Sequence, residues 1–229
     1  MKKFIIFTLV ALLFIIGKSV AHVNHYKKIK SLEYELFLND KLIGLHKFNF
    51  NKKGDLLVVN SIGNFKVTKL GIDLMNYQTK TEEIYKENQL IKFKSKTNQN
   101  DKIKFVNLEY NAKNSHFYID GSSYKGKTQI SSIIGSWWNH EIVTKSKQIS
   151  AVSGRVLDQK VEFLGKNKIK ISDKEYNALH FLILSDDNKP LNKKKLNINV
   201  WYDSKTLLWI KSSYEKLGKW EYRLKTVVF

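Results

Sequence analysis

Five consecutive residues near the middle of the chain combine side chains that could contact a ligand: Ser136, Trp137, Trp138, Asn139 and His140. Two adjacent indoles offer large apolar surfaces, and the amide and imidazole beside them can orient a bound molecule by hydrogen bonding. The tryptophans are either core side chains, as tryptophans more often are, or the mouth of a site on a concave sheet. The second interpretation predicts an apolar or saccharide ligand.

His46 is a second side chain that could bind a ligand or move a proton, and it shares a strand face with Phe48 and Phe50. The simplest interpretation is a core histidine whose ring bonds a backbone carbonyl. A functional role requires that folding bring it close to a partner, for which the candidates are His140, Asp203 and Tyr202. An enzyme with a site near Asn139, His140 and His46 is therefore the alternative to a binding protein.

The chain has no cysteine, which excludes disulfides, thiolate metal sites and cysteine nucleophiles. If cleavage follows Ala21, the amino group and imidazole of His22 could chelate Cu(II), with His25 or His46 completing the site. The simpler interpretation is that cleavage happens to fall there. The loop 186–188 could hold Ca²⁺ weakly but is typical of a turn, and the sequence lacks HExxH, GxSxG and phosphate-loop motifs. We therefore expect no cofactor and no metal.

The N-terminus has the pattern of a signal peptide. Lys2–Lys3 precede the apolar run Phe4–Ile16, and the small residues Ser19 and Ala21 predict cleavage after Ala21. An uncleaved membrane anchor is the alternative, but Lys18 stops the apolar run short of the roughly 20 residues of a spanning helix. We expect a signal peptide over residues 1–21 and an exported, periplasmic domain over residues 22–229.

The net charge of +19, from 40 basic and 21 acidic residues, narrows the choice of partners. Almost all of the basic residues are lysines, with arginine only at Arg155 and Arg223, whereas phosphate and base recognition favours arginine. The lysines are also spread along the chain, as on a solvated surface. We expect no nucleic acid partner. An adaptor that uses lysine charge at an anionic membrane surface is a third hypothesis.

Alternating apolar and polar residues predict about a dozen strands separated by short polar turns. The run Ala178–Ser185 is apolar on both faces, as in an interior strand, and a phase change within 102–110 predicts a β-bulge. The segment 129–148 holds at most a short helix, and residues 22–30 form an irregular lead-in. The chain is therefore an all-β protein, a strongly curved antiparallel sheet or half-open barrel in a single domain.

Three stretches carry a resemblance: Tyr34–Phe48, Ser136–Asn139, and Trp201–Asp203 followed by Leu208–Lys211. In this order they are similar to an uncharacterised family of exported bacterial proteins known only as a domain of unknown function. Its members open with Tyr…Leu-Asn-Gly-x-x-Ile-Gly-x-His and carry a central Ser-x-Trp-Asn. Asp40 stands where their first turn has glycine, and aspartate also tolerates a left-handed backbone. The resemblance implies a curved antiparallel sheet akin to the half-barrels of lipoprotein carriers, and it implies no activity.

Taken together, the sequence favours a non-enzymatic exported β-protein. Its concave face is expected to bind an apolar or amphipathic envelope molecule, such as a lipid, or an envelope protein. The side chains expected to contribute most are Trp137, Trp138, His46, Phe48 and Trp201, with Asn139 and His140 orienting polar groups of the ligand.

Overall fold

The computed structural model describes Tyr26 and residues 28–229. The predicted signal peptide and the hypothetical copper ligands His22 and His25 lie outside the described residues. Within the described part of the chain, no helix is long and apolar enough to cross a membrane.

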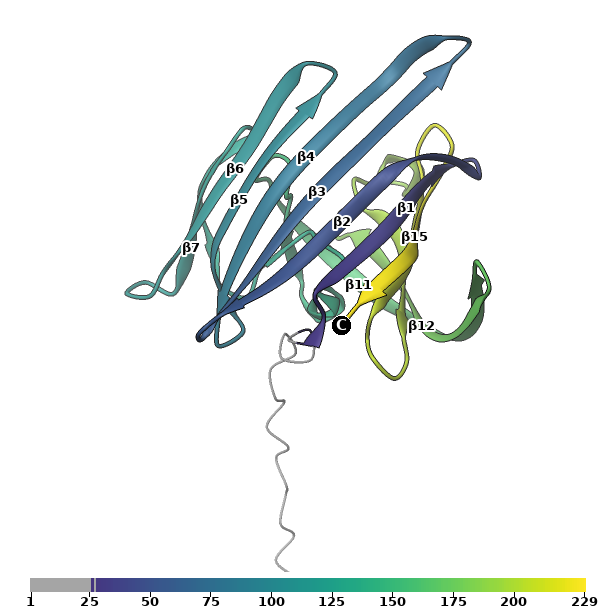
Figure 1. Cartoon of the computed structure of the whole chain (residues 1–229). Helices are drawn as coiled ribbons and strands as arrows, with labels where there is room; N and C mark the ends of the chain where they lie inside the picture. The colour runs from purple at the N-terminus through teal and green to yellow at the C-terminus, as the bar shows by residue number, and fades with distance from the viewer. Residues whose placement is uncertain (1–25, 27) are drawn as a thin grey trace, which may run out of the picture.

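The first half of the chain is a meander of eight strands, several of them long (Figure 1). Alternation of buried and less buried side chains, as in the pattern of β1, gives each strand one face toward the interior. The strands are β1 (Ser31–Leu38), β2 (Lys41–Lys53), β3 (Leu56–Lys69), β4 (Ile72–Lys86), β5 (Gln89–Gln99), β6 (Lys102–Asn111), β7 (His116–Gly121) and β8 (Tyr124–Gln129).

The second half contains seven strands and two short 3₁₀ helices. The strands are β9 (Ile133–Ile134), β10 (Lys147–Ile149), β11 (Val156–Ile171), β12 (Lys174–Ser185), β13 (Asn197–Asp203), β14 (Trp209–Glu215) and β15 (Lys219–Val228). The 3₁₀ helices are η2 (His140–Thr144) and η3 (Leu191–Lys193). The expectation of at most a short helix within 129–148 is confirmed by η2, and β12 is an interior strand between β11 and β13, as predicted.

The fifteen strands of the described residues belong to one sheet, in the order β8-β7-β6-β5-β4-β3-β2-β1-β15-β14-β13-β12-β11-β10-β9. Pairing is antiparallel except between β9 and β10. The first and last strands pair with each other in the middle of this order, from Ser31–Val228 to Leu38–Trp220. The prediction of an all-β, strongly curved antiparallel sheet is confirmed.

The sheet curls until its two ends approach each other (Figure 1). The segment that precedes β11 bridges them, because the backbone N–H of Ser123 donates to the carbonyl of Ser153 over 3.0 Å. The hydroxyl of Ser95 on β5 donates to the carbonyl of Ala151 over 2.6 Å. These contacts close the curled sheet around an interior without a continuous strand ladder at the seam.

Register shifts supply the curvature, but not where the sequence predicted one. Shifts occur in several strand pairs, for example between Val67 and Thr68, whereas β6 pairs with β5 and β7 without a shift. The predicted bulge within 102–110 is therefore wrong. The strand is apolar on both faces: Val106 and Leu108 are buried inside, while Ile103 is 55% exposed on the outer face. The apolar residues of this strand pass from its outer face to its inner face, and in the sequence this resembles the phase change of a bulge.

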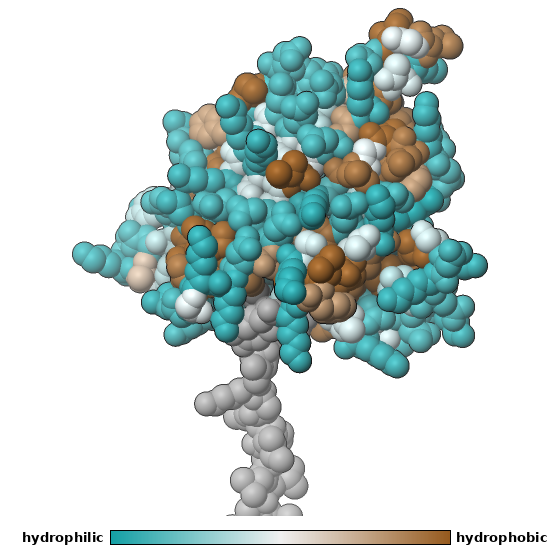
Figure 2. All heavy atoms as spheres, viewed as in Figure 1, coloured by the Kyte–Doolittle hydropathy of each residue, from teal (hydrophilic) through white to brown (hydrophobic). Residues whose placement is uncertain are grey.

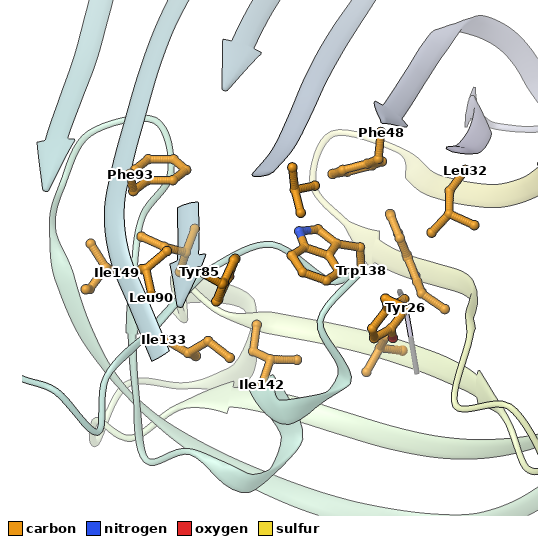
Figure 3. Packing of buried hydrophobic residues seen from close by; sticks show 14 of the residues in the cluster. Tyr26, Leu32, Phe48, Tyr85, Leu90, Phe93, Ile133, Trp138, Ile142 and Ile149 are labelled. Carbon is orange, nitrogen blue, oxygen red and sulfur yellow. The ribbon is translucent and has the colours of Figure 1, made fainter. Parts of the chain in front are cut away.

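The interior is filled at one end by a core centred on Trp138, whose side chain is fully buried (Figure 3). Its ring meets Tyr26 and Phe50 edge-on, each with a centroid separation of 5.2 Å, and Tyr85 at 5.8 Å. Tyr26 belongs to the predicted irregular lead-in, yet it is fully buried and donates its hydroxyl proton to the Leu207 carbonyl over 3.1 Å. The core therefore fills one end of the curled sheet.

Candidate functional site: an aromatic cavity inside the sheet

A cavity of about 520 Å³ occupies the interior beside the core. This volume lies within the roughly 300–1,000 Å³ typical of small-molecule sites. Strands from both halves of the chain contribute to its wall, which is rich in aromatic side chains: Phe48, Phe65, Tyr77, Phe93, Trp137, Trp209, Tyr214, Trp220 and Tyr222.

Trp137 is the member of the central pair that faces the cavity. Its partly buried ring packs edge-on against Trp209 and Tyr222, with centroids 5.5 Å and 5.3 Å apart. The indole Nε1 atoms of Trp137 and of Trp209 are buried and have no hydrogen-bond partner among the described residues. Buried N–H groups normally find an acceptor, so two such donors in the wall of one cavity suit a ligand that carries acceptor atoms.

His46 lines the cavity together with Phe48, whose ring centroid lies 4.3 Å away. Its Nε2 atom lies 3.1 Å from the Ser61 hydroxyl oxygen, which in turn lies 2.8 Å from that of Thr81. The predicted hydrogen bond to a backbone carbonyl is thus replaced by one to a side chain. Burial lowers the pKa of His46 to about 4, because the protein around the ring disfavours the imidazolium. The imidazole is therefore neutral at pH 7 and polar without charge.

Glu83 is a buried acid between the cavity and the core, and sequence reasoning missed it. The side chain is 1% exposed, and its carboxylate accepts hydrogen bonds from Trp138 Nε1 over 2.9 Å and from the Tyr85 hydroxyl over 2.6 Å. Burial raises the pKa of Glu83, which these hydrogen bonds partly oppose. The signal was present in the sequence, because alternation along β4 places Glu83 on the same face as Tyr77 and Tyr85.

Trp138, Asn139 and His140 lie in the core rather than in the cavity wall. The Asn139 side chain caps η2 by accepting a hydrogen bond from the Glu141 backbone N–H over 3.1 Å. The His140 ring is 6% exposed, and its Nδ1 atom lies 3.4 Å from the Tyr26 hydroxyl. These side chains fix the segment that carries Trp137.

The hypothetical partners of His46 are not brought to it. His140 packs against Tyr202, with ring centroids 6.3 Å apart, and the Tyr202 hydroxyl donates to the Trp137 carbonyl over 2.9 Å. Asp203 instead closes its own turn, accepting from the Thr206 backbone N–H over 2.8 Å. The neighbours of His46 are Phe48, Ser61 and Tyr222, so an acid–base pair with a second histidine does not form there.

Trp201 lies on the outer face of the sheet, away from the cavity. The residues on either side of it in β13 are buried in the main core, so alternation directs Trp201 outward. Its ring stacks on His180 at 4.2 Å, and the Lys211 ammonium lies 5.3 Å from its centroid. Trp201 covers a small second cluster instead, formed by Ile171, Ala178 and Ile210.

The rim of the cavity is basic. Lys194, Lys195 and Lys216 contribute to it, together with Glu215 and Leu217. Lys194 is held in place, since its ammonium donates to Asp187 Oδ1 over 3.1 Å and to the Ser185 carbonyl over 2.9 Å.

Asp187, in the loop that could hold Ca²⁺ weakly, is thus paired with a lysine. The hydrogen bond from Lys194 is the main reason that the pKa of Asp187 is lowered. No group of three or more potential metal ligands is present among the described residues.

Comparison with models of protein families identifies the family of this chain. The model of the family described as "Domain of unknown function (DUF6134)" matches residues 34–225. The chain belongs to this family. A comparison with curated proteins found no match.

Among solved structures, the DUF6134 chain is similar to a "beta-barrel-like protein of domain of unknown function DUF1849 from Brucella abortus". The TM-score is 0.59 at 12% sequence identity, with 87% of this chain and 96% of the other covered. At that identity the likeness shows a shared fold only, and that fold is barrel-like.

The three stretches that carried the resemblance to a domain of unknown function converge at Trp209 in the DUF6134 structure. Tyr34 stacks on Trp209 with centroids 4.0 Å apart and donates its hydroxyl proton to the Trp209 carbonyl over 2.8 Å. Phe48 and Trp137 approach the same indole edge-on, at 6.3 Å and 5.5 Å. The motifs therefore build the aromatic boundary between core and cavity.

Proposed function

We propose that this DUF6134 protein is an exported, periplasmic binding protein that holds an apolar or amphipathic envelope molecule inside its curled sheet. Export is supported by the signal-peptide pattern that ends at Ala21. Binding is supported by one observation above the others: a cavity of about 520 Å³ whose wall combines aromatic rings with a few polar groups.

The polar groups favour an amphipathic ligand over a pure hydrocarbon. Trp137 Nε1 and Trp209 Nε1 offer two donors without a protein acceptor in the described chain, and the hydroxyls of Ser61 and Thr81 lie beside neutral His46. Lys195 and Lys216 at the rim favour a negatively charged or polar end near the opening. An acyl chain with an acidic head satisfies each of these preferences.

An enzyme receives less support from the same geometry. His140 and Asn139 are engaged in the core, and the His46 ring bonds the Ser61 hydroxyl rather than a carboxylate. Glu83 lies in the cavity wall and Glu215 at the rim, and both oxygens of Glu83 already accept hydrogen bonds from core side chains. We therefore retain binding as the proposed function.

Fluorescence titration with an anthroyloxy-labelled stearate tests the proposal. Trp137→Ala removes a ring and a donor from the wall, and we expect it to weaken probe binding by roughly tenfold or more, because a buried indole contributes a large apolar area. Trp201→Ala is the matched control, since the same side chain lies on the outer face, and it should leave probe affinity unchanged.

Because Trp137→Ala could lose probe binding by unfolding, a second variant tests the cavity in another way. Met75→Trp fills the cavity near its rim without removing a core group, and it should also exclude the probe. Equal probe affinity for the wild type, Trp137→Ala and Met75→Trp would overturn the proposal. Native mass spectrometry of protein purified from its own compartment should show a retained amphipathic molecule.

A further inference from the structure

Two leucines are almost fully exposed at hairpin tips. Leu217 is 99% exposed and Leu70 is 93% exposed, more than any other large apolar side chain in the described chain. Ile72 and Leu74 follow Leu70 and are 65% and 53% exposed. Figure 2 shows hydrophobic residues gathered at the tip of the long β3–β4 hairpin, which carries Leu70, Ile72 and Leu74.

Both tips have the same sequence, Lys-Leu-Gly, at 69–71 and at 216–218. Leu70 and Leu217 have φ values of 51° and 55°, a left-handed backbone that disfavours leucine. Three two-residue hairpin turns elsewhere in the sheet use polar residues at such positions, namely Asn39–Asp40, Glu87–Asn88 and Asn100–Asp101. Neither turn stability nor solubility accounts for leucine here, so its exposure points to a contact outside the molecule.

The two tips flank the opening of the cavity. Lys216 and Leu217 contribute to the rim themselves, and Phe65 and Met75 of the β3–β4 hairpin line the wall below its tip. Val67 pairs with Met75, so Leu70 projects about 10 Å beyond the wall at roughly 3.3 Å per residue. A surface that contacts both tips therefore covers the opening.

Uncompensated lysines accompany the leucines. Lys69, Lys195 and Lys216 form no ion pair in the described part of the chain, whereas Lys66 nearby pairs with Asp73 at 2.7 Å. Apolar side chains that point outward beside free lysines are complementary to a bilayer with anionic headgroups, where the apolar groups enter the interface and the ammonium groups remain at the phosphates.

A folded protein partner fits these tips less well. Protein interfaces need about 800 Å² per partner with shape complementarity, and their energetic centres are enriched in Trp, Tyr and Arg rather than Leu. Isolated leucines on separate loops provide no such surface. A bilayer is deformable and accepts apolar side chains that are separated from one another.

We propose that the Lys-Leu-Gly tips dock the open end of the cavity on an anionic lipid bilayer. Leu70, Ile72, Leu74 and Leu217 enter the interfacial layer, and Lys69, Lys195 and Lys216 bind the headgroups. The inference deepens the proposed function, because a docked opening gives an amphipathic ligand a path between bilayer and cavity without passing through water. It also stands apart from that function, because docking depends on the tips alone.

Flotation of the purified protein with vesicles tests the docking. Vesicles of phosphatidylcholine alone are compared with vesicles of equal parts phosphatidylcholine and phosphatidylglycerol. We expect binding to the anionic vesicles that weakens with salt. The double variant Leu70→Asn with Leu217→Asn should bind the anionic vesicles at least roughly tenfold more weakly than the wild type, because the inserted apolar area is lost.

Asparagine suits a left-handed turn better than leucine, so the double variant should melt at an equal or higher temperature than the wild type. Phe229→Asn is the matched control, since it removes a 69% exposed apolar side chain at the C-terminal end of the sheet and should bind normally. The triple variant Lys69→Gln, Lys195→Gln and Lys216→Gln should lose the preference for anionic vesicles.

Vesicle binding by the folded double variant equal to that of the wild type overturns the docking proposal, as does equal wild-type binding to both kinds of vesicle. Probe binding separates this result from the proposed function. Trp137→Ala should lose stearate binding and keep vesicle binding, while the double leucine variant should do the reverse.

Discussion

Trp137 and Trp138 are adjacent in the sequence, but their indole N–H groups have opposite surroundings. Trp138 Nε1 donates to Glu83 inside a closed core, whereas Trp137 Nε1 has no acceptor in the described chain and its ring faces the cavity. The difference follows from position in the segment that η2 and its Asn139 cap hold in place. At the scale of the residue, one tryptophan is therefore part of the core and its neighbour lines the cavity.

His46 provides a residue-scale prediction about pH. In the folded protein burial lowers its pKa to about 4, while the unfolded chain takes up the proton near the ordinary value of 6.5. Between these values the unfolded state binds more protons, so stability from this residue is complete above pH 6.5 and is lost as the pH falls toward 4. Going from pH 7 to pH 5, we expect the His46 contribution to fall by roughly 2 kcal/mol.

Urea unfolding at the two pH values, for the wild type and for His46→Gln, measures this contribution. Glutamine can keep a hydrogen bond to Ser61 and does not titrate in this range. The stability gap between the two proteins should shrink at pH 5. Glu83 acts in the opposite sense because burial raises its pKa, but it is common to both proteins and cancels in the comparison. A gap that stays constant between the two pH values contradicts the assignment.

At the scale of the element, the β2–β3 hairpin depends on a close backbone approach at Gly44. A Cβ atom at Gly44 would lie 2.6 Å from the Cα atom of Phe65, its partner in the ladder, and nearer still to the Asn64 carbonyl oxygen. Both obstacles are backbone atoms, so neither can move without disturbing the ladder. A register shift in the β1–β2 pair directly beside Gly44 adds to the bend of the sheet there.

Gly44→Ala should therefore destabilise the protein by roughly 3 kcal/mol. Gly63→Ala on the facing strand is the matched control, because its Cβ would meet only side-chain atoms, Thr79 Cγ2 at 3.1 Å and His46 Cδ2 at 3.2 Å. Those side chains can shift, so we expect a loss of about 1 kcal/mol. Thermal unfolding followed by circular dichroism gives both values, and equal losses would refute the backbone argument.

At the scale of the whole molecule, the first and last strands of the described chain, β1 and β15, meet in the middle of the sheet. The Lys30 backbone N–H donates to the Val228 carbonyl over 2.7 Å, and β1 pairs with β15 along its full length. The last strand is thus an interior strand that joins the two halves of the sheet. Trimming it removes a central ladder rather than an edge.

Two rearranged chains test this organisation. A chain that ends before Lys219 should lose the cooperative melting transition, because both halves are left with unpaired interior strands. A circular permutant that joins Phe229 to the residue before Tyr26 through a Gly/Ser linker, with new ends in the exposed turn at 172–173, should keep the β-rich circular dichroism spectrum and a melting transition. A permutant that fails to fold would show that the order of the strands along the chain matters more than their pairing.

The sequence by itself determined the strands, because alternation of apolar and polar residues has the period of a strand and depends on each residue's own type. It also determined the family, through motifs whose residues turn out to pack around Trp209. The Asn39–Asp40 turn likewise adopts the left-handed backbone expected of Asp40, with a φ of 60°.

Only the tertiary structure decided which apolar face of each strand lines a cavity and which lies outside. Trp137 and Trp201 have the same side chain and equal prominence in the sequence, but the curl of the sheet directs one inward and the other outward. Glu83, Trp209 and Tyr222 line the same cavity as Trp137, from strands far apart in the chain. Such contacts depend on how far the sheet curls before its ends meet. That curl accumulates from the twist between every pair of neighbouring strands, so no single segment of the sequence determines it.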